Sequence, residues 1–291
     1  MEAGQALHRI DHDSDRGRWT LLRRRPPLPL GRYVKEIQGF AEDGGTPVLR
    51  TEVPSGILPL ILVFGPGFSL HDVASPERVR PLDRSFIAGL HERPALVGSA
   101  GCALCMQVDF TPIGARRFLR RDLEDLAGRV VDLDSLVGAL AGGLEARLEA
   151  AKDWPARFVL IEALLSERIL QAPKETPLVG AALQAIEASG GRISVGALAA
   201  ELGCSRKHLA ALVRRHTGLA PKALARILRF EEAFRRLRAG ETASLAALAA
   251  DCGYADQAHF NRDFRAFAGE SPRALLARCL PDGTGILTDP S

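Results

Sequence analysis

Two short stretches in the last hundred residues carry side chains with the chemistry for reading DNA. Each stretch would present its basic and amide side chains on one free face of a helix. These side chains are Arg206, Lys207, Arg214 and Arg215 in the first stretch and Gln257, Asn261, Arg262 and Arg265 in the second. In the major groove Arg recognises guanine and Asn or Gln recognises adenine, while flanking basic residues hold phosphates. The chemistry indicated is recognition of double-stranded DNA.

The two stretches belong to an internal repeat with a period of about 50 residues. With one residue inserted in the second copy, the repeat aligns Ser194 with Ser244, Leu198 with Leu248, Gly203 with Gly253, His208 with His259, Val213 with Phe264, Gly218 with Gly269 and Pro221 with Pro272. In each copy a short Ala- and Leu-rich helix ends at a glycine, and a second helix begins at a capping residue, Ser205 or Asp256. This pattern predicts two helix-turn-helix units.

A long helix, Pro221 to Ala239, is predicted between the two units, and another helix, Leu178 to Ala188, before them. Two units joined by one rigid helix can enter successive major grooves on one side of DNA, roughly 34 Å apart. We therefore expect a single chain to read a non-palindromic site without dimerising. Residues 177–280 hold 15 Lys and Arg against 9 Asp and Glu, a balance of +6, which suits a nucleic-acid-binding module. The rest of the chain then carries a formal net charge of −3.

The second copy contains the most specific motif, Gly253-Tyr-Ala-Asp-Gln-Ala-His-Phe-Asn-Arg-Asp-Phe-Arg-Ala-Phe-Ala-Gly-Glu-Ser-Pro272. On this motif, residues 178–280 resemble the DNA-binding domain of the AraC/XylS family of bacterial transcription regulators. The resemblance implies a domain of about seven helices that binds promoter DNA, with RNA polymerase as a further partner and activation of transcription as an outcome.

The resemblance also implies which residues face the bases, from recognition helices over 205–216 and 256–267. They are Arg206, Lys207, Ala210 and Ala211 in the first helix and Gln257, Ala258, Asn261 and Arg262 in the second. Ala210 and Ala211 depart from the family, in which longer polar or basic side chains often stand there. The first unit would then contact thymine methyl groups or read few bases.

The first half of the chain reads as β-rich. Strands are predicted over 48–53, 57–64, 85–89 and 102–110, between turn residues, and amphipathic helices over 115–119, 133–148 and 154–170. The fold class predicted is α+β and multidomain. The domains are a β-rich effector-binding or dimerisation domain (1–112), a helical connector (113–172), a tandem helix-turn-helix domain (177–280) and a loose tail (281–291).

The stretch Phe110-Thr-Pro-Ile-Gly-Ala115 is similar to the link from the last strand into a helix in the β-rich sensor domain of one group of these regulators. By that analogy the first half binds a small-molecule effector or mediates homodimer formation.

Cysteine and histidine pairs elsewhere in the sequence could also carry chemistry. Cys102 and Cys105 have half the spacing of a zinc site, but no second pair follows closely, which favours two core thiols. A repair protein that transfers alkyl groups to a cysteine on the same DNA-binding domain is the alternative function. His71-Asp72 and His91-Glu92 resemble fragments of a metal site or an enzyme, but loop or surface polar residues are the favoured interpretation. The prediction is no catalytic residue, no metal, no cofactor and no enzyme activity.

Composition restricts where the protein works. No stretch approaches the roughly 18 uninterrupted apolar residues of a membrane span, and residues 1–15 lack the apolar core of a signal peptide. The five cysteines are scattered and odd in number, which indicates reduced thiols. We expect a cytoplasmic protein with no membrane partner.

Overall fold

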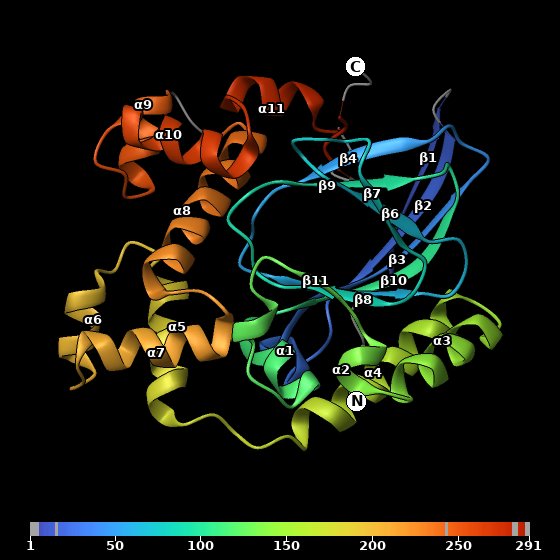
Figure 1. Cartoon of the computed structure of the whole chain (residues 1–291), viewed down its shortest axis with the longest axis horizontal. Coiled ribbons are helices and arrows are strands. Elements are labelled where there is room, and N and C mark those ends of the chain that lie inside the picture. Colours follow the sequence, from blue (N-terminus) through green and yellow to red (C-terminus); the bar gives the residue numbers. More distant parts are fainter. Residues whose placement is uncertain (1–5, 15–16, 242–243, 281–284, 289–291) are drawn as a thin grey trace.

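The chain folds into a pair of facing β-sheets with helices below them and a separate group of helices at one side (Figure 1). This description comes from a computed structural model and covers residues 6–14, 17–241, 244–280 and 285–288. The α+β, multidomain fold class expected from the sequence is confirmed.

The larger sheet has the strand order β1-β2-β3-β10-β5-β8-β11 and the smaller one β4-β9-β6-β7, with antiparallel neighbours throughout. The strands are β1 (His8–Ser14), β2 (Gly17–Arg24), β3 (Val34–Asp43), β4 (Val48–Glu52), β5 (Leu58–Val63), β6 (Phe68–His71), β7 (Val79–Leu82), β8 (Phe86–Ala88), β9 (Ala95–Ser99), β10 (Ala103–Phe110) and β11 (Val130–Asp132). A short 3-10 helix, η1 (Leu30–Arg32), precedes β3. The four predicted strands correspond to β4, β5, β8 and β10.

Helices cover the lower face of the larger sheet. They are α1 (Pro112–Leu119), the 3-10 turn η2 (Glu124–Leu126), α2 (Asp134–Val137), α3 (Leu140–Ala150) and α4 (Trp154–Leu170). Alternate residues of β10, Met106, Val108 and Phe110, are fully buried in one core cluster with Phe118 of α1 and Phe158 of α4. This alternation is the period of two that a strand imposes, and it leaves the odd-numbered residues of β10 to face the other sheet.

The first half departs from the sequence expectations in three places. One helix was predicted over 133–148, but α2 and α3 are separated at Gly138, whose φ of 59° places it in the left-handed region. The stretch expected to be a helical connector, 113–172, also supplies β11, which pairs with β8 and so extends the sheet. The hairpin β1–β2, the long strand β3 and the short strands β6, β7 and β9 were not predicted.

The helices at the side are α5 (Pro177–Ala188), α6 (Val195–Glu201), α7 (Arg206–Thr217), α8 (Pro221–Arg238), α9 (Leu245–Asp251), α10 (Gln257–Ala268) and α11 (Pro272–Arg278). All the helices predicted in this part are confirmed, with boundaries shifted by at most one or two residues. In Figure 1, α8 runs between two groups of helices, α5–α7 at its start and α9–α11 at its end.

Residues 285–288, expected to belong to a loose tail, lie along the edge strand β4. The Thr51 amide donates to the Ile286 carbonyl (2.8 Å), and the Thr288 amide donates to the Leu49 carbonyl (2.8 Å). Ile286 is buried. The described part of the tail therefore links α11 to the smaller sheet, while residues 281–284 and 289–291 lie outside the described residues.

We expect Phe264→Ala to destabilise the α8–α10 packing by about 3–5 kcal/mol, because it removes a fully buried ring that contacts Phe230, Phe234 and Phe260. Chemical unfolding followed by circular dichroism measures the change. Val159→Ala removes an exposed side chain from α4 and should shift stability by no more than about 0.5 kcal/mol. Equal effects of the two changes would contradict the packing described here.

Candidate nucleic-acid interface and ligand cavity

The first helix-turn-helix unit is α6 and α7. Ser194 caps α6 by accepting from the Ala197 amide (3.0 Å), and Ser205 caps α7 by accepting from the His208 amide (3.1 Å). Gly203, with a φ of 63°, makes the turn between them. Leu209 and Val213 are buried against the unit's core, which fixes the opposite face of α7 toward solvent.

The second unit, α9 and α10, repeats this construction. Ser244 and Asp256 are the caps, and Gly253, with a φ of 78°, makes the turn. Phe260 and Phe264 take the buried positions that Leu209 and Val213 hold in the first unit. The tandem helix-turn-helix prediction is confirmed by both copies.

The residues predicted to meet DNA lie on the outward faces of α7 and α10. Only Ala210 and Asn261 are partly covered; the exposed ones are Arg206, Lys207, Ala211, Arg214, Arg215, Gln257, Ala258, Arg262 and Arg265. Five of these residues are cations whose side chains make no hydrogen bond or ion pair within the described part of the chain: Arg206, Lys207, Arg214, Arg262 and Arg265. These five cations are therefore available for an external partner.

Two other basic residues are engaged within the protein. Arg215 lies 3.5 Å from Asp122, which precedes η2 and also pairs with Arg116. Arg229 of α8 lies over the Tyr254 ring and donates to the Gly253 carbonyl (3.4 Å). Arg229 therefore fastens the turn of the second unit.

Sequence reasoning missed a buried ion pair in the second unit. Asp263 of α10 is 8% exposed at its side chain and accepts from Arg226 of α8 at 2.8 Å; Arg226 also pairs with Glu92 at 3.3 Å. Asp263 aligns with Leu212 of the first copy. A carboxylate in a position that is apolar in the sister repeat was the available signal that a cation had to lie nearby.

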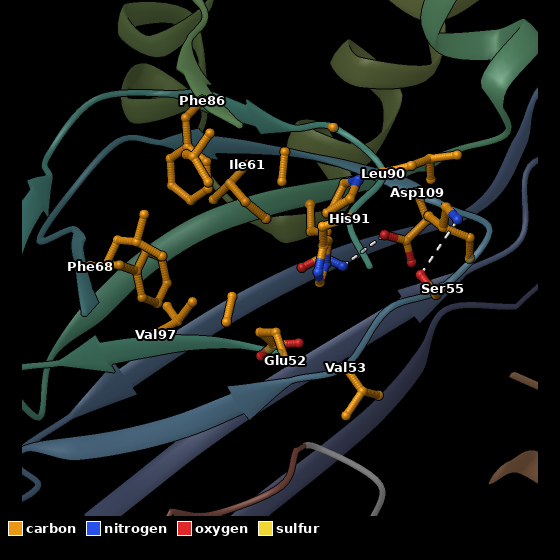
Figure 2. Close-up of a pocket in the computed structure, with 18 of the residues that line it drawn as sticks. Glu52, Val53, Ser55, Ile61, Phe68, Phe86, Leu90, His91, Val97 and Asp109 are labelled. Atoms are coloured by element: carbon orange, nitrogen blue, oxygen red, sulfur yellow. Dashed lines mark hydrogen bonds between the residues drawn. The ribbon is translucent and has the colours of Figure 1, made fainter. Parts of the chain in front are cut away.

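A cavity of about 770 Å³ lies between the two sheets. Figure 2 shows Phe68 and Phe86 at one end and Asp109 at the other, with Glu52 and His91 between them. His91 lies in the loop after β8, and this loop lines the cavity, which the interpretation as a loop or surface residue did not foresee. The lining extends to Leu219, in the turn between α7 and α8, so the cavity reaches the first unit's helices.

Burial shifts the ionisation of the cavity's polar groups. It raises the pKa of Asp109 to about 6, although hydrogen bonds from Gln107 and Gln38 act in the opposite direction. It raises the pKa of Glu52, whose exposed surface faces the cavity rather than bulk water, and lowers the pKa of His91. Each shift has the same cause, which is the cost of holding a charge away from water.

The two cysteines with half the spacing of a zinc site differ in burial, because Cys102 is half-buried and Cys105 is buried. Cys105 is buried in β10 and lines the cavity, and burial raises the pKa of its thiol to about 12, so the thiol is protonated at neutral pH. Within the described ranges, no group of three or more His, Cys, Asp or Glu residues is placed to hold a metal ion. Nothing in this arrangement supports alkyl transfer to a cysteine.

The comparisons with known proteins agree with the C-terminal geometry. Residues 198–278 match the family described as a helix-turn-helix domain. The HTH-type transcriptional activator RhaS of Pectobacterium carotovorum is 27% identical over 137 residues, which are 43% of this chain and 49% of that protein. The chain thus spans about half the length of the curated relatives it matches.

Solved structures are also similar. A chain described as a probable AraC family transcriptional regulator from Rhodopseudomonas palustris is 32% identical, with 35% of this chain and 97% of that one covered and a TM-score of 0.32. ToxT of Vibrio cholerae is 10% identical over 83% of this chain and 97% of its own, with a TM-score of 0.45. By sequence, residues 198–278 therefore belong to a family of helix-turn-helix domains, and the proteins similar to this part of the chain are described as transcription regulators. None of the helices among the described residues is long and apolar enough to cross a membrane.

We expect Arg226→Met to destabilise the second unit by roughly 3 kcal/mol, because Asp263 would stay buried without its cation. Chemical unfolding of the full chain measures the loss. Arg226→Met combined with Asp263→Leu should regain most of it, since an apolar pair can replace a buried ion pair. Glu92→Gln, which removes only the exposed partner, should cost no more than about 1 kcal/mol. A double variant no more stable than the single one would contradict this role.

Asp109 should make stability fall as pH rises. Its pKa is about 6 in the folded protein and about 3.9 in an unfolded chain, so between these values the folded state holds a proton that the unfolded state has lost. The fall across this window should reach about 3 kcal/mol, and Asp109→Asn should remove it. Unfolding between pH 4 and 7, followed by the fluorescence of Trp19 and Trp154, measures it, with Asp13→Asn on the exposed β1 as the control. An unchanged pH profile in Asp109→Asn would refute the assignment.

Proposed function

We propose that this protein is a promoter-specific regulator of transcription that reads double-stranded DNA with α7 and α10 and responds to a small molecule held between its sheets. One observation carries the proposal. Two capped helices with free basic faces lie at opposite ends of one long helix, α8, so that the two helix-turn-helix units are held by a single rigid element. Two such units suit successive major grooves on one face of DNA.

Within this proposal the contacts divide into two kinds. Arg214 and Arg265, near the carboxyl ends of the two recognition helices, would hold phosphates together with Arg215 once its pair with Asp122 opens. Base contacts fall to Arg206, Lys207, Ala210 and Ala211 on α7 and to Gln257, Ala258, Asn261 and Arg262 on α10. Phosphate contacts position the protein and base contacts select the sequence.

The same proposal assigns a route from the ligand to the DNA. His91 lines the cavity, and its neighbour Glu92 pairs with Arg226, which holds Asp263 of α10. A ligand that displaces His91 would therefore also move Glu92, which is linked through Arg226 to the second helix-turn-helix unit. The ligand can change the free energy of DNA binding only by as much as its own binding free energy differs between the two placements of the second helix-turn-helix unit.

The remaining parts of the proposal concern the cellular setting. We place the protein in the cytoplasm, with residues 1–112 as the effector-binding or dimerisation domain, 113–172 as the connector and 177–280 as the DNA-binding domain. RNA polymerase and a second copy of the chain are proposed partners, and activation follows the description of the RhaS relatives.

The direct test selects bound sites from a random library of duplex DNA with the full chain. A bipartite motif spanning about one helical turn supports the proposal. Binding that is strongly salt-dependent but independent of sequence would contradict the proposal, because only the electrostatic attraction to the DNA phosphates would then remain.

On the selected site, Arg262→Ala should weaken binding by about 1–3 kcal/mol and relax the preference at one base pair, because a bidentate contact to a base edge is lost. Arg214→Ala, on the free face of α7, should weaken binding to all sequences alike and reduce the slope of log affinity against log salt by about 1. Titrations on the selected and a scrambled duplex at several salt concentrations separate the two. An equal loss on both duplexes for Arg262→Ala would make it a phosphate contact.

A further inference from the structure

The polar groups of the cavity restrict the ligand more than its size does, because three donor side chains in its walls, Gln38, Gln107 and Arg50, are already used. The side-chain amides of Gln38 and Gln107 donate to the two carboxylate oxygens of Asp109, at 3.0 and 2.7 Å. The Arg50 guanidinium donates to the buried Glu42 at 3.1 Å. A ligand that needs donors from these side chains would have to break existing bonds.

The imidazole of His91 is fixed in one protonation state. Its Nδ1 lies 2.5 Å from the Arg93 carbonyl oxygen, which can only accept, so Nδ1 carries the proton. Burial lowers the pKa of His91, which favours the neutral form of the ring at and above neutral pH. Nε2 is left as an acceptor.

Acceptors, in contrast, remain open in the cavity. The Glu52 carboxylate makes no hydrogen bond to any residue in the described part of the chain, and it points into the cavity in Figure 2. Asp109 accepts one bond at each oxygen, and a carboxylate has room for about four. With Nε2 of His91, three acceptors line one space.

The charges in the same walls favour a cation. Four arginines line the cavity. Arg50 is matched by Glu42, and Arg23 lies 3.7 Å from Glu36. Arg93 and Arg129 are exposed residues of the loops at its edge, where bulk water and salt screen their charges. An ionised Glu52 or Asp109 away from water is costly unless an opposite charge lies beside it. A bound cation lowers that cost, whereas a bound anion raises it.

The other end of the cavity is apolar. Phe68 of β6 and Phe86 of β8 lie there with Ile61 and Val97, opposite the end that holds Asp109 (Figure 2). A volume of about 770 Å³ is within the range of sites for drug-sized ligands. The cavity is therefore polarised along its length, with aromatic rings at one end and acceptors at the other.

We propose that the ligand of this cavity is an apolar or aromatic molecule with a protonated amine or guanidinium head, which Glu52 and Asp109 bind while Phe68 and Phe86 enclose its body. The inference deepens the proposed function and rests on it, because it gives the effector a chemical class.

The test measures binding of three probes to the full chain by calorimetry: a naphthylbutyl amine, and the alcohol and the carboxylate with the same carbon skeleton. At pH 7.5 the amine should bind at least tenfold more tightly than the alcohol, and the carboxylate more weakly than either. Glu52→Gln should reduce the advantage of the amine over the alcohol at least fivefold, and Asp109→Asn should reduce it as well. Glu77→Gln, a surface carboxylate remote from the cavity lining, is the matched control and should leave the order unchanged.

The proposal is overturned if the carboxylate binds as tightly as the amine, if the advantage of the amine survives in both cavity variants, or if none of the three probes binds. Site selection with the wild-type chain separates this failure from failure of the proposed function. A sequence-specific DNA motif without amine binding refutes only the ligand class, whereas the absence of any sequence preference refutes the regulator itself.

Discussion

The arrangement of this protein depends on the packing of aromatic rings along α8. Phe230 and Phe234 contact Phe264, and Phe230 also contacts Phe267, so the second recognition helix is fastened to the far end of α8 by a dry aromatic cluster. At the near end, Leu224 and Ile227 are buried in the core that also contains Leu209 and Val213. Close packing of this kind allows the helices few alternative arrangements. The distance between the two helix-turn-helix units therefore follows from the length of α8.

The same helix also faces the sheets. The Gly56 amide donates to Glu231 of α8 at 2.9 Å, and Arg226, one turn earlier, pairs with Glu92 in the loop after β8. A Cβ at position 56 would lie 2.7 Å from the Leu228 side chain, so the β4–β5 turn approaches α8 closely. α8 therefore sets the distance between the two helix-turn-helix units and also packs against the β-rich half.

The sequence predicted the helical part well because its signals are local. Capping serines, glycines in the left-handed region and hydrophobic spacing lie within a few residues of the boundaries they define, and the repeat presents each of them twice. The hairpin β1–β2 was missed because His8–Ser14 alternates charged and polar residues and its pairing partner lies beyond it in the chain. Such a strand looks like a loop until the neighbouring strand is known.

The cavity could not be predicted for a related reason. Glu52, His91 and Asp109 come from β4, from the loop after β8 and from β10, and only the facing of two sheets brings them into one space. His91 and Glu92 were interpreted as loop or surface residues, and both do lie in the loop after β8, but the interpretation gave no sign that this loop lines a cavity. The alternation of residues predicts which side chains share one face of a strand, but it does not predict which sheet will lie opposite that face.

The two halves have opposite electrostatic requirements, and the charge distribution meets both. The helical half, at +6, presents free arginines to a polyanion, whereas the β-rich half carries its unpaired carboxylates inside a cavity. Solvent screens charges beyond roughly 8 Å at physiological salt, so the charge of a ligand between the sheets would reach the DNA only weakly through water. Contact is the stronger route. Arg226 is held by Glu92 on one side and by buried Asp263 on the other. Under the proposed function, a shift of the loop beside the cavity would change the placement of α10 without any charge having to act at a distance.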